Sequence, residues 1–198
     1  RIVIIGAGGH GKVVYDAILA QNIYSIVGFV DTLVPVGTAV KDNCTVICDQ
    51  RSIIELKGIA DYFIIAIGNN LLREQVFSAV IDLLKPATVI HPSAVFGSDI
   101  IFGKGSVALA NCVINTNCFI GENSIVNSGV VIDHDCKIGK SVHLAIGTMV
   151  GSNSTVGNGY SSGIGEHINS FSKISCSKQL SERIYSIVSS ISLSKNFE

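Results

Sequence analysis

A histidine between two carboxylates, Asp133, His134 and Asp135, is the arrangement in this sequence best suited to acid–base chemistry. An adjacent carboxylate can orient an imidazole ring, favour its charged form and raise its basicity, which suits the histidine to act as a general base. Asp135 is the favoured partner and Asp133 the less favoured one. A lone exposed histidine is usually an ordinary surface residue, but the two flanking acids favour the functional interpretation here.

Cys136 offers a second chemistry, because a thiol two residues from a histidine can accept an acyl group. Cysteines occupy the same position of the repeat described below at Cys112 and Cys118, so packing is the favoured interpretation. None of the six cysteines stands in a Cys-x-x-Cys pair. We therefore expect neither a metal site nor a disulfide.

A glycine-rich turn, from Gly6 through Gly8 to Gly11, follows a predicted strand at 2–5 and opens a predicted helix at 12–21. Asp31 lies twenty residues beyond Gly11 at the end of the next predicted strand, 25–30. Glycines in this setting let the backbone approach a pyrophosphate at a helix N-terminus, and the acid can accept hydrogen bonds from a ribose. The alternative is a tight turn that only packs strand against helix.

The first part of the chain alternates strands and helices, with a further buried strand at 62–67, the turn Gly68-Asn69-Asn70 and a helix at 71–84. This order predicts a small parallel sheet with crossover helices over residues 1–86. A nicotinamide-dependent dehydrogenase is a rival interpretation of the glycine turn. A module of about 85 residues is, however, short of the two-half sheet that binds dinucleotides, so a mononucleotide-sized ligand is favoured.

From residue 90 every sixth residue is apolar, twelve times without a miss: Ile90, Phe96, Phe102, Ala108, Ile114, Ile120, Val126, Ile132, Ile138, Leu144, Val150 and Val156. This period predicts a solenoid of triangular coils, in which each short strand points one aliphatic residue inward. Glycine and asparagine recur directly after the aliphatic residue, where we expect tight corners. Small residues recur at the fourth position after the aliphatic residue. The N-terminal domain is expected to cap one end of the stack.

The repeat also places the reactive histidine. His134 comes two residues after the inward Ile132, so it should lie on the outer surface beside a corner, where the solenoid has no structural need of a histidine. The register fades after Val156 and breaks at Ser162. We assign the solenoid to residues 87–180, with degenerate coils from 161, and a C-terminal tail to 181–198.

Composition excludes several partners. The net charge of −1 gives no field that would recruit nucleic acid or an anionic membrane surface. Hydrophobic residues make up 47% of the chain and the mean hydropathy is +0.49, yet no apolar run is long enough to span a bilayer. Because no signal-peptide pattern precedes the first strand, we expect a cytoplasmic protein.

Taken together, these motifs resemble the bacterial sugar acetyltransferases of the left-handed β-helix superfamily, the group that contains UDP-4-amino-sugar N-acetyltransferases and sialic acid O-acetyltransferases. The likeness covers residues 1 to about 157. The catalytic strip of that family has an asparagine seven residues before a histidine–acid pair and a second histidine nine residues after it. Asn127, the pair His134 and Asp135, and His143 match these spacings.

The resemblance implies an α/β Rossmann-like domain that binds a sugar nucleotide, followed by a left-handed parallel β-helix and a homotrimeric assembly. It implies acetyl-CoA as co-substrate, lying between adjacent subunits, and His134 as the general base oriented by Asp135. Asn127 and His143 would neighbour the thioester. Apart from the resemblance, acyl transfer needs a donor to the oxyanion, and we assign this role to a backbone N–H near a corner, that of Gly151. The implied sugar-nucleotide site comprises Gly8, His10, Gly11, Asp31, Gly68 and Asn69, with Arg73 beside them.

The expected reaction is therefore acetyl transfer to the amino group of a UDP-linked amino sugar, and sialic acid O-acetylation is the alternative. A rival from another class is a non-catalytic solenoid that binds carbohydrate. A nicotinamide oxidoreductase is the third hypothesis. Binding of CoA, UDP-sugars and NAD separates the three.

Overall fold

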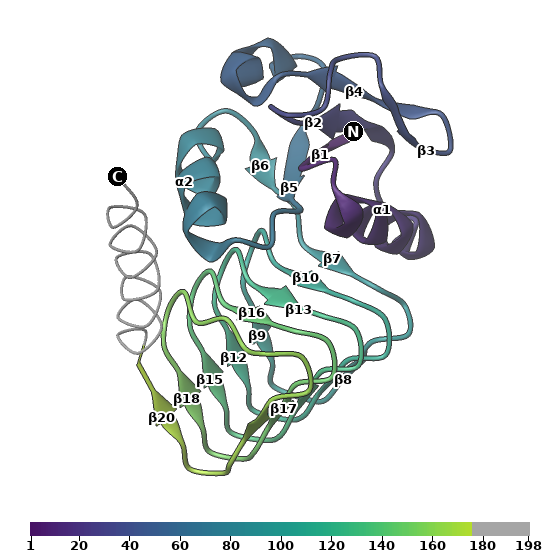
Figure 1. Ribbon diagram of the computed structural model, residues 1–198. Coiled ribbons are helices and arrows are strands. Elements are labelled where there is room, and N and C mark those ends of the chain that lie inside the picture. Colours follow the sequence, from purple (N-terminus) through teal and green to yellow (C-terminus); the bar gives the residue numbers. More distant parts are fainter. Residues whose placement is uncertain (176–198) are drawn as a thin grey trace, which may run out of the picture.

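A computed structural model describes residues 1–175 of the chain. It consists of an α/β domain that lies along one side of a triangular parallel β-helix (Figure 1). The last residues assigned to the solenoid and the tail 181–198 lie outside the described residues.

The N-terminal sheet has the strand order β3-β4-β2-β1-β5-β6. Its strands are β1 (Ile2–Ile5), β2 (Ile26–Val30), β3 (Ala39–Lys41), β4 (Cys44–Cys48), β5 (Tyr62–Ile65) and β6 (Lys85–Pro86), and all pairs except β3 with β4 are parallel. Strand β1 is buried on both faces, as its continuous apolar run predicts. One face packs against helix α1 (Gly9–Gln21) and the other against α2 (Asn70–Val80).

Four details of this domain differ from the prediction. Helix α1 begins at Gly9 rather than at residue 12, so part of the glycine turn is already helical, and α2 ends at Val80 rather than at residue 84. The hairpin β3–β4 and the 3-10 segment η1 (Gln50–Leu56) were not predicted. These short elements lack the long apolar run or the helical period that identifies the others.

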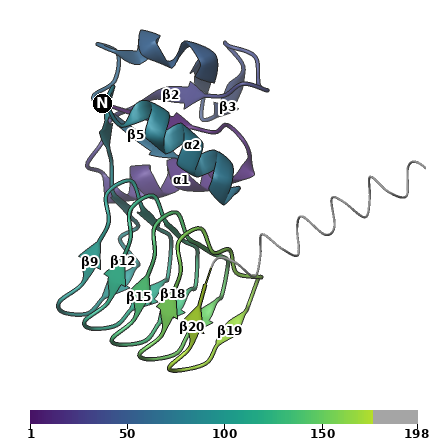
Figure 2. The ribbon, with the colours of Figure 1, turned by 90° about the vertical axis from the view of Figure 1, so that its left-hand side faces the viewer.

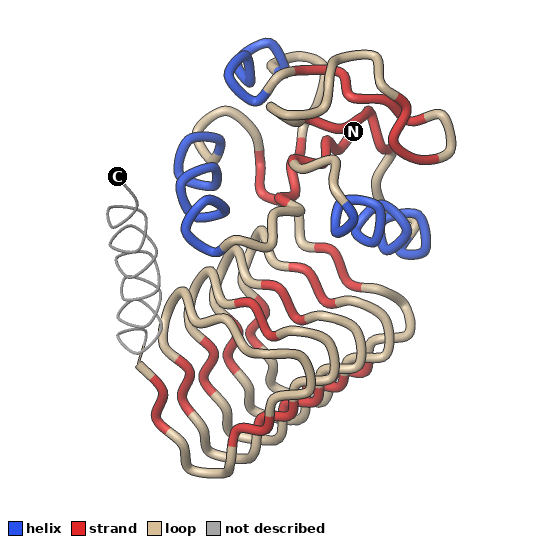
Figure 3. Tube along the Cα trace, in the orientation of Figure 1, coloured by secondary structure: helices blue, strands red, loops and turns tan. Residues whose placement is uncertain are grey.

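The β-helix stacks strands of two residues into three parallel sheets, which Figure 3 shows as short red segments joined by tan corners. Each strand pairs with the strand eighteen residues away, so one coil is three hexads long. The strands are β7 (Val89–Ile90), β8 (Val95–Phe96), β9 (Ile101–Phe102), β10 (Val107–Ala108), β11 (Val113–Ile114), β12 (Phe119–Ile120), β13 (Ile125–Val126), β14 (Val131–Ile132), β15 (Lys137–Ile138), β16 (His143–Leu144), β17 (Met149–Val150), β18 (Thr155–Val156), β19 (His167–Ile168) and β20 (Lys173–Ile174).

The predicted inward positions are confirmed. The second residue of each strand from β10 to β18 is buried in one continuous core, together with the small residues of the predicted small positions. Cys136 is one of these and is fully buried. Burial raises the pKa of the Cys136 thiol to about 11, so it stays protonated at neutral pH and the packing interpretation is confirmed.

The recurring glycines serve a different purpose from the predicted one. Gly121 and Gly139 follow inward residues and do not have positive φ angles. A Cβ on Gly121 would lie 2.6 Å from the backbone of Gly139 in the next coil, so close stacking of coils requires glycine there. The positive φ angles occur instead at residues such as Asn117, Asp135 and Asn153, at 58°, 60° and 58°.

The break in the sixfold register at Ser162 is local, because a neighbouring side chain fills the space that a larger inward residue would occupy. Ser162 occupies the inward position one coil after Leu144, and its hydroxyl bonds to Thr148 Oγ1 and accepts from the Ala145 N–H, both at 2.7 Å. Tyr160, two residues earlier, is buried in the same core and supplies the missing apolar volume. The coil therefore continues through β19 and β20.

The N-terminal domain covers a side face of the β-helix rather than capping one end, as Figure 2 shows. Helix α1 packs over the outward side chains of β7, β10 and β13, namely Val89, Val107 and Ile125. All three are buried, whereas outward residues on the other two sheets are mostly exposed. The apolar outward residues of this sheet thus belong to the interface between the two domains.

Candidate active site

His134 and Asp135 form a hydrogen-bonded pair on the corner that follows β14. His134 Nδ1 lies 2.6 Å from Asp135 Oδ2, and both side chains are about half exposed. The other oxygen, Asp135 Oδ1, accepts a hydrogen bond from Asn117 Nδ2 at 2.5 Å. His134 Nε2 is left as the atom that can take a proton from a substrate.

The charges around this corner make His134 a stronger base than a free histidine. The hydrogen bond to Asp135 raises the pKa of His134, with a smaller contribution from Asp133. The same hydrogen bond lowers the pKa of Asp135, so that the carboxylate stays ionised. Asp133 accepts from the His134 N–H at 2.8 Å and therefore fixes the turn rather than the ring.

Asp135 is held in place by the stacked corners. It has a positive φ angle, like Asn117 one coil earlier and Asn153 one coil later. Aspartate and asparagine tolerate this conformation better than most residues. Beside the pair lies an open groove of about 390 Å³, whose lining includes Asp135, Asn117, Phe119 and Lys137.

A second cluster lies where the N-terminal domain meets the β-helix. His143, the outward residue of β16, is within 3.3 Å of the Gly68 carbonyl oxygen through Nδ1 and of Asn127 Nδ2 through Nε2. The ring of His10, from the first turn of α1, lies 6.1 Å from the His143 ring between centroids. Asn127 and His143, which were predicted beside the thioester, thus lie together with Gly68 and His10, which were predicted in the sugar-nucleotide site.

Both rings of this cluster are neutral at neutral pH. Burial, with smaller contributions from the neighbouring His143 and Arg73, lowers the pKa of His10 to about 4. Burial also lowers the pKa of His143, against the opposing effect of the Gly68 carbonyl oxygen. The cluster can therefore donate and accept hydrogen bonds but does not supply a cationic imidazole.

The glycine turn lies at the carboxyl end of β1. Strand β2 lies on one side of β1 and strand β5 on the other, so the strand order reverses at this point. Ligands of open α/β sheets bind in the crevice at such a switch point. A Cβ on Gly8 would meet nothing within 4 Å, so the backbone there is open to a ligand. A Cβ on Gly11 would lie 2.1 Å from the Gly6 carbonyl oxygen, so Gly11 is required for packing.

Asp31 braces the backbone around this turn. Its Oδ2 accepts from the Ala7 N–H at 2.7 Å, and its Oδ1 accepts from the N–H groups of Leu33 and Val34 at 2.8 and 3.2 Å. Burial alone would raise the pKa of Asp31, but these donors outweigh it and hold the pKa below its usual value. The carboxylate has room for about one further donor, so any contact with a ribose is limited to that position.

Arg73 joins the two domains and does not face a ligand, which corrects the placement that the resemblance implied. Its side chain is 1% exposed. The guanidinium donates to the oxygens of Asn70 (Oδ1), Ile67, Gly68, Asn123, Ser141 and Val142, at 2.7 to 3.3 Å. Asn69 likewise acts as the N-cap of α2, since its Oδ1 accepts from the Leu72 N–H at 2.9 Å.

The two clusters lie on opposite sides of one β-helix. Asn127 and His143 belong to the sheet that faces the N-terminal domain, whereas His134 lies on the corner between the other two sheets. The inward residues Val126, Ile132 and Leu144 fill the space between them. Sequence spacing alone did not reveal this separation, and a site that uses both clusters requires a second copy of the chain.

The oxyanion role predicted for the Gly151 N–H does not agree with the structure. This N–H donates to the Ile168 carbonyl oxygen at 2.8 Å and is committed to the strand ladder. The next residue, Ser152, occupies the corner position of His134 one coil later, next to Asn153, whose N–H donates to the His134 carbonyl oxygen at 3.0 Å. Within residues 1–175 the Ser152 N–H has no acceptor.

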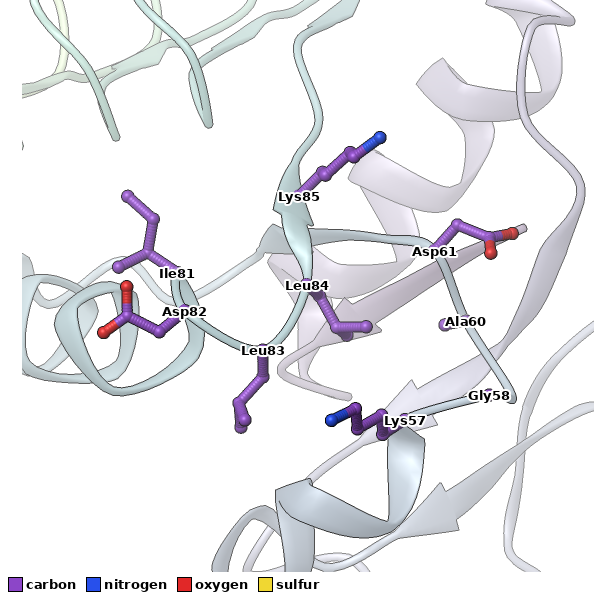
Figure 4. A pocket seen from close by; sticks show the side chains of 9 residues that line it. All are labelled: Lys57, Gly58, Ala60, Asp61, Ile81, Asp82, Leu83, Leu84 and Lys85. Atoms are coloured by element: carbon purple, nitrogen blue, oxygen red, sulfur yellow. The ribbon is translucent and has the colours of Figure 1, made fainter.

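A second hollow lies away from both clusters of side chains. A hollow of about 340 Å³ lies between segments 57–61 and 81–85, at the amino ends of β5 and β6, and none of the predicted site residues lines it (Figure 4). Residues 1–175 contain no cluster of three or more potential metal ligands. None of the helices in these residues is long and apolar enough to cross a membrane.

Known proteins resemble this chain in both its N-terminal domain and its β-helix. The PglD N-terminal domain family matches residues 1–80. Perosamine N-acetyltransferase from Caulobacter crescentus, solved as a histidine variant with CoA and GDP-perosamine, has a TM-score of 0.83 and 30% identity, over 88% of this chain and 82% of that one. The chain belongs to the bacterial left-handed β-helix sugar acetyltransferases.

Two further relatives extend the comparison. UDP-N-acetylbacillosamine N-acetyltransferase from Bacillus subtilis (strain 168) is 31% identical over 114 residues, 56% of this chain and 51% of that protein. The match therefore spans about half the length of this curated relative. The acetyltransferase domain of PglB from Neisseria gonorrhoeae FA1090, solved with acetyl coenzyme A, has a TM-score of 0.67 and 28% identity, over 88% and 92% of the two chains.

Proposed function

We propose that the protein transfers the acetyl group of acetyl-CoA to the amino group of a nucleotide-linked amino sugar. The observation that carries the proposal is the His134–Asp135 pair on a β-helix whose N-terminal domain presents an open glycine turn. Relatives named for N-acetylation of bacillosamine and perosamine nucleotides support nitrogen rather than oxygen as the acceptor atom. No feature of residues 1–175 favours sialic acid over a nucleotide sugar.

In the proposed reaction the neutral amine attacks the thioester carbonyl carbon while His134 Nε2 removes its proton. Asp135 keeps the other ring nitrogen protonated and stabilises the imidazolium as it forms. The tetrahedral intermediate then expels the CoA thiolate, which can take the proton from His134. We assign the oxyanion contact to the Ser152 N–H, since the Gly151 N–H is engaged.

We further propose a homotrimer in which the His134 corner of one subunit meets the Asn127 and His143 face of its neighbour. An apolar stripe supports this assembly: Val95, Val113, Val131 and Met149 are the outward residues of one sheet, and most of them are exposed. A solvated sheet face usually carries polar residues at these positions. The stripe leads to the corner that holds His134.

Mixed assemblies test whether the site is shared. His134→Ala and His143→Ala subunits should each be nearly inactive alone. Trimers co-assembled from equal amounts of the two should recover about a quarter of the wild-type activity, because that share of interfaces has both residues intact. No recovery in mixed trimers of confirmed composition would show that the site lies within one subunit.

The pH dependence of turnover should change in Asp135→Asn. His134 acts as a base only above its pKa, and the hydrogen bond to Asp135 raises that pKa. Removing the carboxylate lowers the pKa, so the ascending limb of kcat against pH should move to lower pH while the plateau falls about tenfold or more. Asp133→Asn, the control, should move the limb less. An unmoved limb in Asp135→Asn would contradict the assigned pairing.

Ligand binding separates the proposal from its two rivals. CoA and an amino-sugar nucleotide should each raise the melting temperature, whereas NAD should not. Stabilisation by NAD alone would favour the oxidoreductase, and no response to CoA would favour a carbohydrate-binding solenoid.

A further inference from the structure

The loop that connects β2 to β3 holds four consecutive apolar residues, Leu33 to Val36, and all of them except the half-buried Val34 are exposed. The Leu33 side chain is 92% exposed and Val36 is 61% exposed, whereas Val34 packs against the core. Single exposed leucines are common on protein surfaces, but runs of exposed apolar residues usually have a function.

This loop is held firmly in its exposed position. Asp31 Oδ1 accepts from the Leu33 and Val34 N–H groups, and the Gly37 N–H donates to the Val46 carbonyl oxygen at 2.8 Å. The sheet therefore fixes the loop at both ends. A fixed loop that leaves Leu33 in water gains no folding energy from that side chain.

The position of the loop identifies what it can cover. The same Asp31 carboxylate accepts a hydrogen bond from the Ala7 N–H in the glycine turn. One side chain therefore holds both the turn and the loop at the carboxyl ends of the parallel strands. When a diphosphate lies on such a turn, the nucleoside extends over the end of the next strand, here β2. Because three N–H groups already occupy Asp31, the contacts that hold the nucleoside must come largely from other groups at this edge.

We propose that the Leu33 side chain packs against the base of the nucleotide-linked acceptor and forms one wall of the nucleoside end of the site. This inference rests on the proposed function for the identity of the ligand. It assigns to Asp31 a positioning role, in which one carboxylate sets the phosphate turn and the base-binding loop together.

Leu33→Ala tests the inference, with Ile23→Ala as the matched control. Ile23 is 68% exposed and lies between α1 and β2, at the amino ends of the parallel strands. Calorimetric titration of the full chain with UDP and with GDP should show binding of at least one of them. For the tighter nucleotide, Leu33→Ala should weaken Kd about three- to tenfold, the scale for part of a leucine side chain. Ile23→Ala should leave Kd unchanged.

A ligand without a base makes the test specific. Inorganic pyrophosphate should bind wild type and Leu33→Ala equally, and Leu33→Phe should retain nucleotide binding because a ring can also stack on a base. Equal weakening for pyrophosphate, an unchanged Kd for both nucleotides, no nucleotide binding by wild type, or a changed oligomer mass in Leu33→Ala would each overturn the inference.

Acetyl transfer separates this inference from the proposed function. If Leu33→Ala weakens nucleotide binding but wild type acetylates no amino-sugar nucleotide, the nucleoside site stands and the proposed reaction fails. If wild type acetylates such an acceptor while Leu33→Ala keeps the wild-type KM for it, the reaction stands and the inference about Leu33 fails.

Discussion

Replacing His134 by alanine should lower the turnover number for acetyl transfer by about a hundredfold or more, the usual scale for loss of a general base. The amine would then have to lose its proton to water during its attack on the thioester. Because substrate binding does not depend on proton transfer, KM for both substrates should change much less than kcat. Steady-state release of the CoA thiol at saturating acceptor measures the effect.

The variant should remain folded, since the His134 side chain is about half exposed and lies outside the core. Thr116 occupies the same corner position one coil earlier, which makes Thr116→Ala a matched control. That control should keep near-normal turnover. If His134→Ala also keeps near-normal turnover, His134 is not the base.

Replacing Arg73 by methionine should destabilise the protein by about 3 kcal/mol or more, which corresponds to a fall in Tm of roughly 6 to 12 °C. Burial lowers the pKa of Arg73 to about 10, so the guanidinium is still charged at neutral pH and donates to oxygens of both domains. Methionine fills similar space but leaves those buried oxygens without donors. Arg73→Lys should recover only part of the loss, because an ammonium group cannot reproduce the planar fork.

Thermal unfolding with Lys104→Met as control measures this effect. The Lys104 side chain is mostly exposed and makes only a 4.0 Å ion pair with Glu122, so its removal should change stability by less than about 0.5 kcal/mol. A loss below about 1 kcal/mol in Arg73→Met would show that the guanidinium does not hold the domains together.

The sequence predicted those features that depend on a local period. The sixfold spacing identified inward residues such as Ile132 and Leu144, and therefore placed His134 outside, beside a corner. The glycine turn was likewise identified from the strand before it and the helix after it. In each case the physical cause acts within a few residues of the chain.

Other features could not be predicted because their causes are distant in sequence. Arg73 binds carbonyl oxygens of residues fifty or more positions away, such as Asn123 and Ser141, and nothing near it signals this. Asp31 stands at a typical ribose-binding position in the sequence. In the structure, N–H groups of the glycine turn and of the loop after β2 already donate to its carboxylate. His134 and His143 are half a coil apart and therefore lie on opposite sides of the triangular β-helix. The regular sixfold spacing along the chain does not by itself show this separation.

Acetyl transfer from acetyl-CoA to the amine of a nucleotide-linked sugar can be measured through both of its products. Purified full chain is incubated with acetyl-CoA and a panel of UDP- and GDP-linked 4-amino sugars, and both free CoA thiol and the acetylated nucleotide sugar are quantified. We predict equal amounts of thiol and N-acetylated product for at least one acceptor, and neither above background in His134→Ala. Binding of CoA and acceptor without product, or equal rates in wild type and His134→Ala, would contradict the account.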